Sequence, residues 1–209
     1  MSKFWRYLNQ TIIHPAKAFQ QLLADPHHLR YGTEVVFLIG ILYSFTVIGL
    51  ALNHASVATP PVVMIPAEQY YFWQSFFTLP VFVLAWILAS GLAHLLSKFF
   101  RGRGTFEGTA SVLGFALSLP GFVTWIVETV ITVLTLIGVM HQGAWTELTS
   151  HQGFWQVFAY VYQLVALGWY LVLFPLAVGV AQQLRWWQAF IVGLFTFGVV
   201  GSVVFLFIR

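Results

Sequence analysis

Glu128 is the acid placed most deeply within an apolar stretch of this chain. Thr124 precedes it by four residues, and Thr132 and Thr135 follow it by four and seven. These spacings place the four side chains on one face of a helix. An ionisable side chain at the centre of a membrane helix costs roughly 2.5–3.5 kcal/mol on insertion scales, so the face must turn toward the interior of the protein. The pattern predicts an intramembrane polar stripe.

Candidate partners for Glu128 follow from counting residues from the expected helix ends. At ~1.5 Å per residue, four other polar side chains share its depth within roughly 5 Å. They are Gln163, Tyr162, Tyr43 and Ser44. Two interpretations stay open: an ion, proton or polar-substrate site, or a neutral glutamate that fixes helix register. The lack of a second charge at the centre of any predicted span favours the second interpretation.

Catalytic and metal-binding signatures are missing from the sequence. With no cysteine, the chain has no thiolate nucleophile, thiolate metal site or disulfide. No HExxH, G-x-S-x-G or P-loop motif is present, and no two histidines have zinc-site spacing on a helix. His94 lies one helical turn before Lys98 and is expected at the membrane interface. We therefore expect a protein that is not an enzyme and that uses no cofactor and no metal.

A short basic turn offers the other candidate site. Arg101 and Arg103 alternate with two glycines, and Thr105 is placed to cap the helix that follows. Guanidinium groups beside a helix N-terminus suit a lipid phosphate. The simpler interpretation, which is slightly favoured, is that the two arginines only set topology.

The composition is that of a membrane protein. Of 209 residues, 59% are hydrophobic and 7% are charged, whereas a soluble domain carries roughly 25% charged residues. The surface must therefore face lipid, which is the first expected partner. A net charge of +3 is too small to indicate nucleic acid. A membrane-protein partner or a second copy of the chain is compatible with the sequence.

Apolar runs predict an all-α bundle of five transmembrane helices. The expected spans are 31–53, 69–98, 105–140, 153–181 and 186–208. They form a transmembrane domain over 31–209, and residues 54–68 and 141–152 are expected to be loops. Residues 1–30 are expected to be a cytoplasmic, interfacial amphipathic segment with helices over 3–13 and from Pro15. In the first helix Phe4, Trp5, Leu8 and Ile12 are expected to share the apolar face.

The third span is too long for an ordinary crossing. Residues 105–140 would reach roughly 54 Å as one helix, against a hydrocarbon core of ~30 Å. Pro120 and Gly121 predict a kink, and we expect a tilted, broken helix, or alternatively a re-entrant half-helix before Pro120. Pro80 and Pro175 predict kinks in two other spans.

Basic residues give the orientation. Eight of the nine precede the first span or fall between spans two and three or four and five, and only Arg209 lies on the other side. The positive-inside rule places the N-terminus in the cytoplasm.

Stripes of small residues at spacing four predict where the helices pack closely. They are Ala85, Ala89 and Ala93; Ala110, Gly114 and Ser118; Gly40 and Ser44; and Gly198 and Ser202. We expect packing seams inside one bundle.

Three stretches together resemble the Yip domain family (Ypt/Rab-interacting proteins), its bacterial members in particular. They are Pro15–Leu22 with Asp25-Pro26, then Gly102–Phe106 continuing to Leu119-Pro120, and Trp169 with Gln188-Ala189-Phe190. The resemblance implies five spans, a cytoplasmic N-terminus and no catalytic residues.

The resemblance also sets the functional expectation. Eukaryotic relatives bind small GTPases and act in vesicle trafficking and membrane shaping. Their longer cytoplasmic N-terminal region has no counterpart here. The expected function is a non-enzymatic, membrane-organising or partner- or lipid-binding role in the bacterial inner membrane. The alternative is a small transporter or ion channel that uses Glu128.

Overall fold

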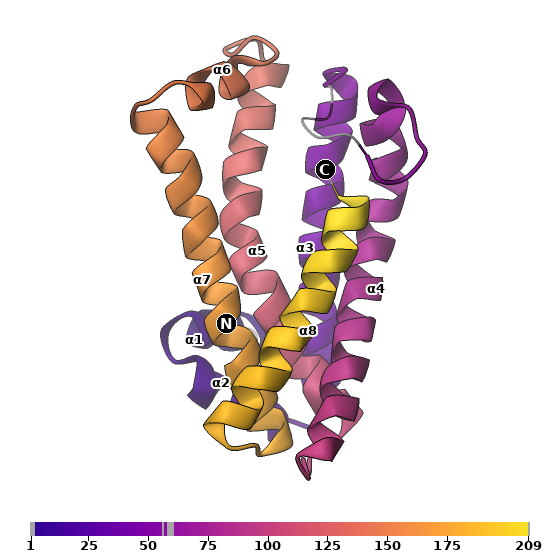
Figure 1. Ribbon diagram of the computed structural model, residues 1–209, viewed down its shortest axis with the longest axis vertical. Helices are drawn as coiled ribbons and strands as arrows, with labels where there is room; N and C mark the ends of the chain where they lie inside the picture. Colours follow the sequence, from indigo (N-terminus) through magenta and orange to yellow (C-terminus); the bar gives the residue numbers. More distant parts are fainter. Residues whose placement is uncertain (1–2, 56, 58–60, 209) are drawn as a thin grey trace.

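The computed structural model describes residues 3–55, 57 and 61–208, and over these residues it contains helices and their connections (Figure 1). In chain order the elements are α1 Lys3–Ile13, α2 Pro15–Leu23, α3 His28–Leu52, η1 Ala67–Gln69, α4 Tyr70–Phe99, α5 Phe106–Leu136, α6 Ala144–Ser150, α7 Phe154–Gln182 and α8 Trp186–Phe207. Arg209, the basic residue assigned to the outer side, lies outside the described residues.

Five of these helices are long and apolar enough to cross a membrane: α3, α4 with its preceding turn η1, α5, α7 and α8. The predicted all-α bundle of five spans is confirmed, and each predicted span coincides with one helix. Large apolar side chains cover the outside of these helices, as lipid-facing surfaces require.

The expected break in the third span is wrong. α5 runs in one piece through Pro120, so the re-entrant alternative is not found either. Proline removes one backbone donor, and close neighbours can hold such a helix together, as they do where Pro120 is fully buried. At ~1.5 Å per residue its 31 residues reach roughly 46 Å, which is longer than the ~30 Å hydrocarbon core. The predicted loop 141–152 is also wrong in part, because it contains α6.

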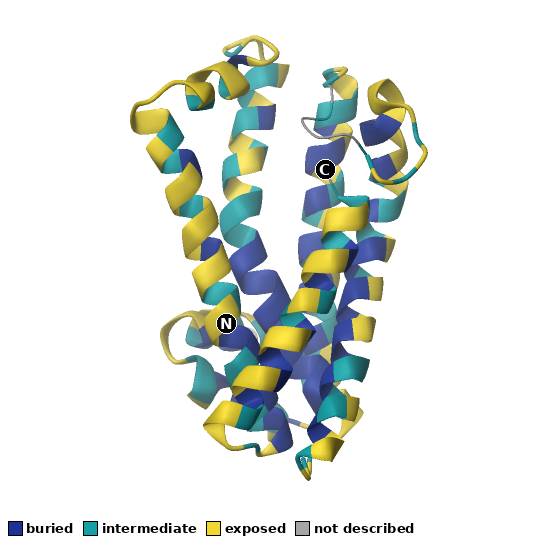
Figure 2. Cartoon of the chain, viewed as in Figure 1, coloured by how far each residue is buried: buried dark blue, intermediate teal, exposed yellow. Residues whose placement is uncertain are grey.

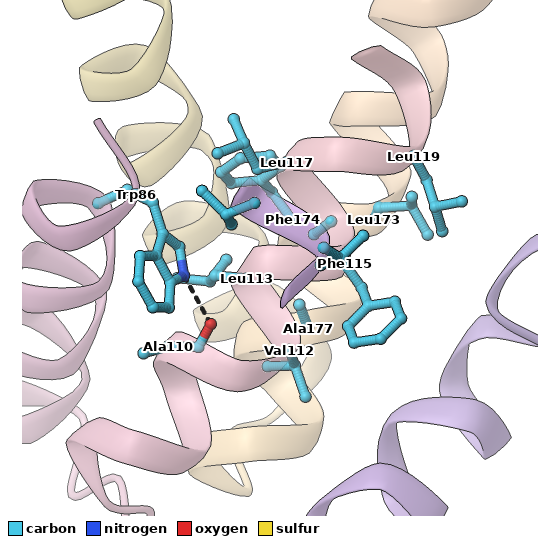
Figure 3. Packing of buried hydrophobic residues seen from close by; sticks show 14 of the residues in the cluster. Trp86, Ala110, Val112, Leu113, Phe115, Leu117, Leu119, Leu173, Phe174 and Ala177 are labelled. Atoms are coloured by element: carbon cyan, nitrogen blue, oxygen red, sulfur yellow. Dashed lines mark hydrogen bonds between the residues drawn. The ribbon is translucent and has the colours of Figure 1, made fainter. Parts of the chain in front are cut away.

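The half of the bundle near α1 and α2 is tightly packed. Every residue of α5 from 108 to 121 is buried. α3 crosses α5 so closely that a Cβ atom on Gly114 would lie 2.5 Å from the carbonyl oxygen of Gly32. Trp86 of α4 donates from Nε1 to the carbonyl oxygen of Ala110 at 2.7 Å (Figure 3). The small-residue stripe of α5 is thus a packing seam, as predicted.

In the other half of the bundle, α5 and α7 are loosely packed. From residue 122 to the end of α5, Thr132 alone is buried. Figure 2 shows the upper parts of α5 and α7 largely intermediate or exposed, whereas the lower centre of the molecule is buried. α6 lies across the upper ends of these two helices (Figure 1). We call this half the outer half, and the half beside α1 and α2 the inner half.

One predicted seam does not pack against the bundle. Gly198 and Ser202 of α8 are exposed, and a Cβ atom on Gly198 would meet nothing within 4 Å. By contrast, a Cβ atom on Gly40 of α3 would lie 2.7 Å from Leu79 of α4. α8 packs on α4 and α7 through its other face, where Gly193 meets Pro175.

The N-terminal helices lie against the inner end of the bundle. α2 buries Ala18, Phe19 and Leu22, and the last two join the main hydrophobic cluster together with residues of α5 and α7. In α1 the predicted apolar face is only partly right. Phe4 and Leu8 pack against the cluster, but Trp5 and Ile12 are exposed, and the buried residues are Tyr7 and Thr11. The segment thus covers the bundle and also presents apolar side chains outward.

Asp25 ties α1 to the start of α3. Its carboxylate accepts hydrogen bonds from Lys3 Nζ at 2.9 Å, Tyr7 Oη at 3.1 Å and the backbone N–H of His27 at 3.0 Å. The bond from the His27 N–H, followed by the one from Lys3, holds the pKa of Asp25 well below its ordinary value.

Candidate functional site

Tyr43 and Thr124 form the centre of the predicted polar node. Their hydroxyls are 2.6 Å apart and join α3 to α5. Thr124 also donates to the carbonyl oxygen of Gly121 at 3.0 Å. Tyr43 in turn interacts with the carboxyl of Glu128, one helical turn further out on α5. The structure therefore brings together three of the residues that the sequence grouped.

Three other residues of the predicted node, Thr132, Ser44 and Gln163, do not join this contact. Thr132 donates to the backbone carbonyl of Glu128 at 2.8 Å, and Ser44 donates to that of Gly40 at 2.9 Å. Both bonds stay within one helix. Gln163 is exposed and donates to the hydroxyl of Tyr162 at 3.3 Å.

Tyrosines of three other helices lie within electrostatic range of Glu128. Its carboxyl interacts electrostatically with Tyr43 of α3, Tyr71 of α4, and Tyr162 and Tyr170 of α7. We call these five residues the Glu128 site. The Glu128 side chain nevertheless stays exposed, so protein surrounds it at longer range without closing over it.

Two members of the Glu128 site were missed from the sequence. Tyr170 lies deeper than Glu128, and its hydroxyl is 3.3 Å from the position of a Cβ atom on Gly121. The prediction considered only side chains at the depth of Glu128. Tyr170 was therefore not among the candidates, because it lies two helical turns from Tyr162. Tyr71 lies in the first turn of α4, within a run of aromatic residues.

A second line of polar contacts holds α3 against α5 in the outer half. The hydroxyls of Thr46 and Thr129 are 2.7 Å apart, and Asn53 Nδ2 donates to the carbonyl oxygen of Thr132 at 3.5 Å. Between membrane helices such hydrogen bonds average about 0.6 kcal/mol. They keep these two helices together where apolar packing is sparse.

Over the described residues, no three His, Asp or Glu side chains come together as metal ligands do. The Glu128 site has a single carboxylate among phenolic hydroxyls. Chemically, it can accept hydrogen bonds from a donor or a cation, and it can take up a proton.

The basic turn has a defined shape. Arg101 has a left-handed backbone with φ 62°, and Lys98 Nζ donates to the carbonyl oxygens of Gly102 and Gly104 at 3.4 and 3.3 Å. Thr105 caps α5, its hydroxyl accepting from the Gly108 N–H at 3.1 Å. The side chains of Arg101 and Arg103 are exposed.

Gln182, at the end of α7, anchors this turn and was missed from the sequence. It is fully buried and donates from Nε2 to Thr109 at 2.7 Å, with His94 Nδ1 at 3.1 Å. Its side-chain oxygen accepts from the Gly104 N–H at 3.2 Å, and its carbonyl oxygen accepts from the Arg103 N–H at 3.1 Å. The backbone donors are thus used internally, which leaves the two guanidinium groups to meet an anion.

The glycines of the turn permit close contact with protein. A Cβ atom on Gly104 would collide with the carbonyl oxygen of Ala181, and one on Gly102 would lie 2.8 Å from Gln182 Oε1. The only signal for Gln182 in the sequence was an amide at the end of an apolar run.

The three span prolines occupy different surroundings. Pro80 is exposed on α4, Pro120 is buried in α5, and Pro175 of α7 lies against Gly193 of α8. Kinks at Pro80, Pro120 with Gly121, and Pro175 stay predictions.

An apolar pocket of about 1050 Å³ lies between α5, α6 and α7 in the outer half. Ile126, Val130 and Leu134 of α5 and Phe158 of α7 form part of its wall. Its polar lining residues, among them His141 and Glu147 with 3.5 Å between His141 Nε2 and Glu147 Oε2, lie on or beside α6. We call this the α5–α7 pocket.

Comparison with known proteins gives one match. Residues 9–208, nearly the whole chain, match the Yip1 domain family. No curated protein and no solved structure matches the chain.

Proposed function

The chain belongs to the Yip1 domain family, and we propose that it is a non-enzymatic integral membrane protein that organises the membrane around it by binding lipid. The proposal places it in a bacterial inner membrane with its N-terminus, the segment 1–30 and the basic turns in the cytoplasm. The observation that carries the proposal is the α5–α7 pocket.

The pocket has the chemistry of an acyl-chain site. Branched and aromatic side chains of two spanning helices line it, and its polar residues lie together near α6. A lipid has the same order along its length, with an apolar chain below a polar headgroup. The pocket also continues the lipid-facing surface, where Ile126, Val130, Phe154 and Val157 are exposed. Its volume of about 1050 Å³ lies just above the roughly 300–1,000 Å³ of small-molecule sites.

Exposed Arg101 and Arg103 extend the proposal to the inner leaflet. Two guanidinium groups close to the membrane surface attract anionic headgroups. Each basic residue contributes about 1 kcal/mol to the free energy of this attraction. Thr105 contributes by fixing the start of α5 beside them. A membrane-protein partner or a second copy of the chain would meet the same lipid-facing helices.

Photocrosslinking tests the lipid site. The protein is reconstituted with a phospholipid that carries a diazirine in its acyl chain, and crosslinked peptides are mapped. We expect adducts on α5 and α7 within the pocket, and their loss in Val127→Trp, which fills the pocket. Val172→Trp, on an exposed surface of α7 outside the pocket, is the matched control. Equal labelling in both variants would reject the site.

Transport through the Glu128 site is a second candidate function. It is favoured by one observation, that the Glu128 side chain is exposed rather than packed away. Flux of protons or monovalent cations into liposomes, compared between the natural protein and Glu128→Gln, tests it. Transport predicts a flux that Glu128→Gln abolishes, and an identical flux in both proteins would exclude it.

A further inference from the structure

The polar end of the α5–α7 pocket carries one carboxylate and no basic side chain. Among the described residues that line the pocket, Glu147 is the only Asp, Glu, Lys or Arg, and its side chain is exposed. The outer connections 53–69 and 137–153 also contain no Lys or Arg in the sequence. The charge at this end of the pocket is therefore negative, which disfavours a lipid headgroup of net negative charge.

His141 places a second acceptor beside this carboxylate. Its Nδ1 lies 3.1 Å from the carbonyl oxygen of Gln142, and because a carbonyl oxygen only accepts, Nδ1 is the donor in this bond. In the neutral imidazole the other nitrogen, Nε2, then carries a lone pair. Nε2 lies 3.5 Å from Oε2 of Glu147, so two acceptors face each other at the pocket rim. A donor from outside the chain that reaches both atoms would satisfy the pair.

A primary ammonium has the chemistry that this pair of acceptors requires. It carries three N–H donors on one positively charged head, so it can donate to Glu147 and His141 at once and balance the carboxylate charge. A divalent metal ion fits less well, because calcium takes six to eight oxygen ligands. The described residues bring no third His, Asp or Glu side chain to a shared site.

Aromatic rings line the same end of the pocket. Trp145 of α6 and Trp155 of α7 have ring centroids 6.3 Å apart, and Phe158 packs edge-on against them at 6.5 and 6.2 Å. All three side chains line the pocket. Tryptophan is enriched at the level of lipid headgroups, and its ring face attracts ammonium groups. The rings therefore place the pair of Glu147 and His141 at headgroup depth, with the apolar wall of α5 and α7 beside it for an acyl chain.

Two further polar side chains of the pocket suit a phosphate that brings its own counter-charge. They are the imidazole of His151 and the amide of Gln152, both exposed. In their neutral forms they offer N–H donors to a phosphate oxygen without adding positive charge. A phosphate linked to an ammonium group is already balanced in charge. A phosphate linked to a neutral alcohol would instead bring an unbalanced negative charge beside Glu147.

We propose that the α5–α7 pocket selects an aminophospholipid, whose ethanolamine ammonium bridges Glu147 and His141 while an acyl chain lies between α5 and α7. The inference rests on the proposed lipid-binding function and deepens it by naming the headgroup.

Competitive photocrosslinking in nanodiscs tests the proposal. The nanodiscs contain equal amounts of two phospholipid probes with the same diazirine-bearing acyl chain, one with an ethanolamine and one with a glycerol headgroup. We expect adducts on the pocket peptides of α5 and α7 to favour the ethanolamine probe about twofold to fivefold, the range of an exposed ion pair. Glu147→Gln is expected to abolish this preference. Glu68→Gln, which removes the exposed acid of the other outer connection, is the matched control and is expected to keep it.

A third probe with a choline headgroup separates hydrogen bonding from charge, because its ammonium has no N–H donor. It is expected to label the pocket less than the ethanolamine probe does. Equal labelling by these two probes would overturn the hydrogen-bonded bridge between Glu147 and His141.

Failure of the headgroup proposal and failure of the lipid site give different results. Equal labelling by the ethanolamine and glycerol probes, or a preference that persists in Glu147→Gln, would overturn headgroup selection and leave lipid in the pocket. Absence of pocket adducts with every probe would reject the proposed function as well. If Glu147→Gln does not fold, His141→Leu removes the second acceptor and is expected to reduce the preference. An unchanged preference in His141→Leu would contradict the bridge.

Discussion

The hydroxyls of Tyr43 and Thr124 lie 2.6 Å apart, just beyond the point where α5 ceases to be buried. On one side of this bond, residues 108–121 are enclosed by their neighbours, and on the other side Glu128 is exposed. The bond thus marks the boundary between a packed inner half and an outer half that carries both proposed sites.

Tyr43→Phe removes this bond without changing the shape of the side chain. We expect a loss of about 0.6 kcal/mol in the free energy of unfolding, the average for hydrogen bonds between membrane helices. Unfolding by a denaturing detergent measures it. Tyr160→Phe, at an exposed position of α7, is the control. A loss above about 2 kcal/mol would mean that Tyr43 supports more of the outer half than this one contact.

Gly114→Ala tests the α3–α5 crossing. Its new Cβ would lie 2.5 Å from the carbonyl oxygen of Gly32, so the helices must separate, at a cost of about 1–3 kcal/mol in unfolding free energy. Gly91→Ala is the matched change within α4, where a Cβ would meet nothing within 4 Å. It is expected to be neutral or to stabilise by up to about 1 kcal/mol. Equal effects of the two substitutions would contradict the close crossing.

Gln182→Leu tests the anchor of the basic turn. The change leaves the Gly104 N–H without its acceptor and removes the amide that donates to Thr109, at an expected cost of about 1–3 kcal/mol. We also expect faster proteolysis at Arg101 and Arg103, because the turn loses a contact that holds it to α7. Gln163→Leu, at an exposed site, should change neither quantity. Unchanged proteolysis in Gln182→Leu would show that the turn is held by other contacts.

Asp25 makes stability depend on pH in the acid range. Its pKa is lower in the folded protein, so its contribution is fully present above the unfolded value, near 3.8. The contribution is lost as the pH falls from there through the folded value. The stability difference between the natural protein and Asp25→Asn should be constant at neutral pH and should narrow below about pH 4. Thermal unfolding across pH measures it, and a difference that widens on acidification would contradict the ion pair with Lys3.

The sequence was sufficient to predict the membrane spans but not the contacts between them. Long apolar runs fix where helices cross the membrane, and Thr105 and Pro15 mark helix starts that the structure contains. Pro120 was misleading because local chemistry predicts a break, whereas burial among neighbouring helices keeps α5 continuous. Gly198 and Ser202 misled for a related reason, since a small-residue stripe does not reveal which face meets a partner.

The polar sites were likewise predicted only in part. Tyr43, Thr124 and Glu128 were grouped by helix periodicity and by depth, and the structure brings them together. Tyr170 lies at another depth, and Gln182 gains its partners from three other segments. Such contacts depend on helix tilt and rotation, which one sequence does not specify.

Native mass spectrometry of the protein released from nanodiscs tests lipid binding in the α5–α7 pocket most directly. The account predicts that a phospholipid stays bound through mild activation in the natural protein and in Val172→Trp, and that Val127→Trp, which fills the pocket, retains one lipid fewer. The same number of retained lipids in all three proteins would contradict it.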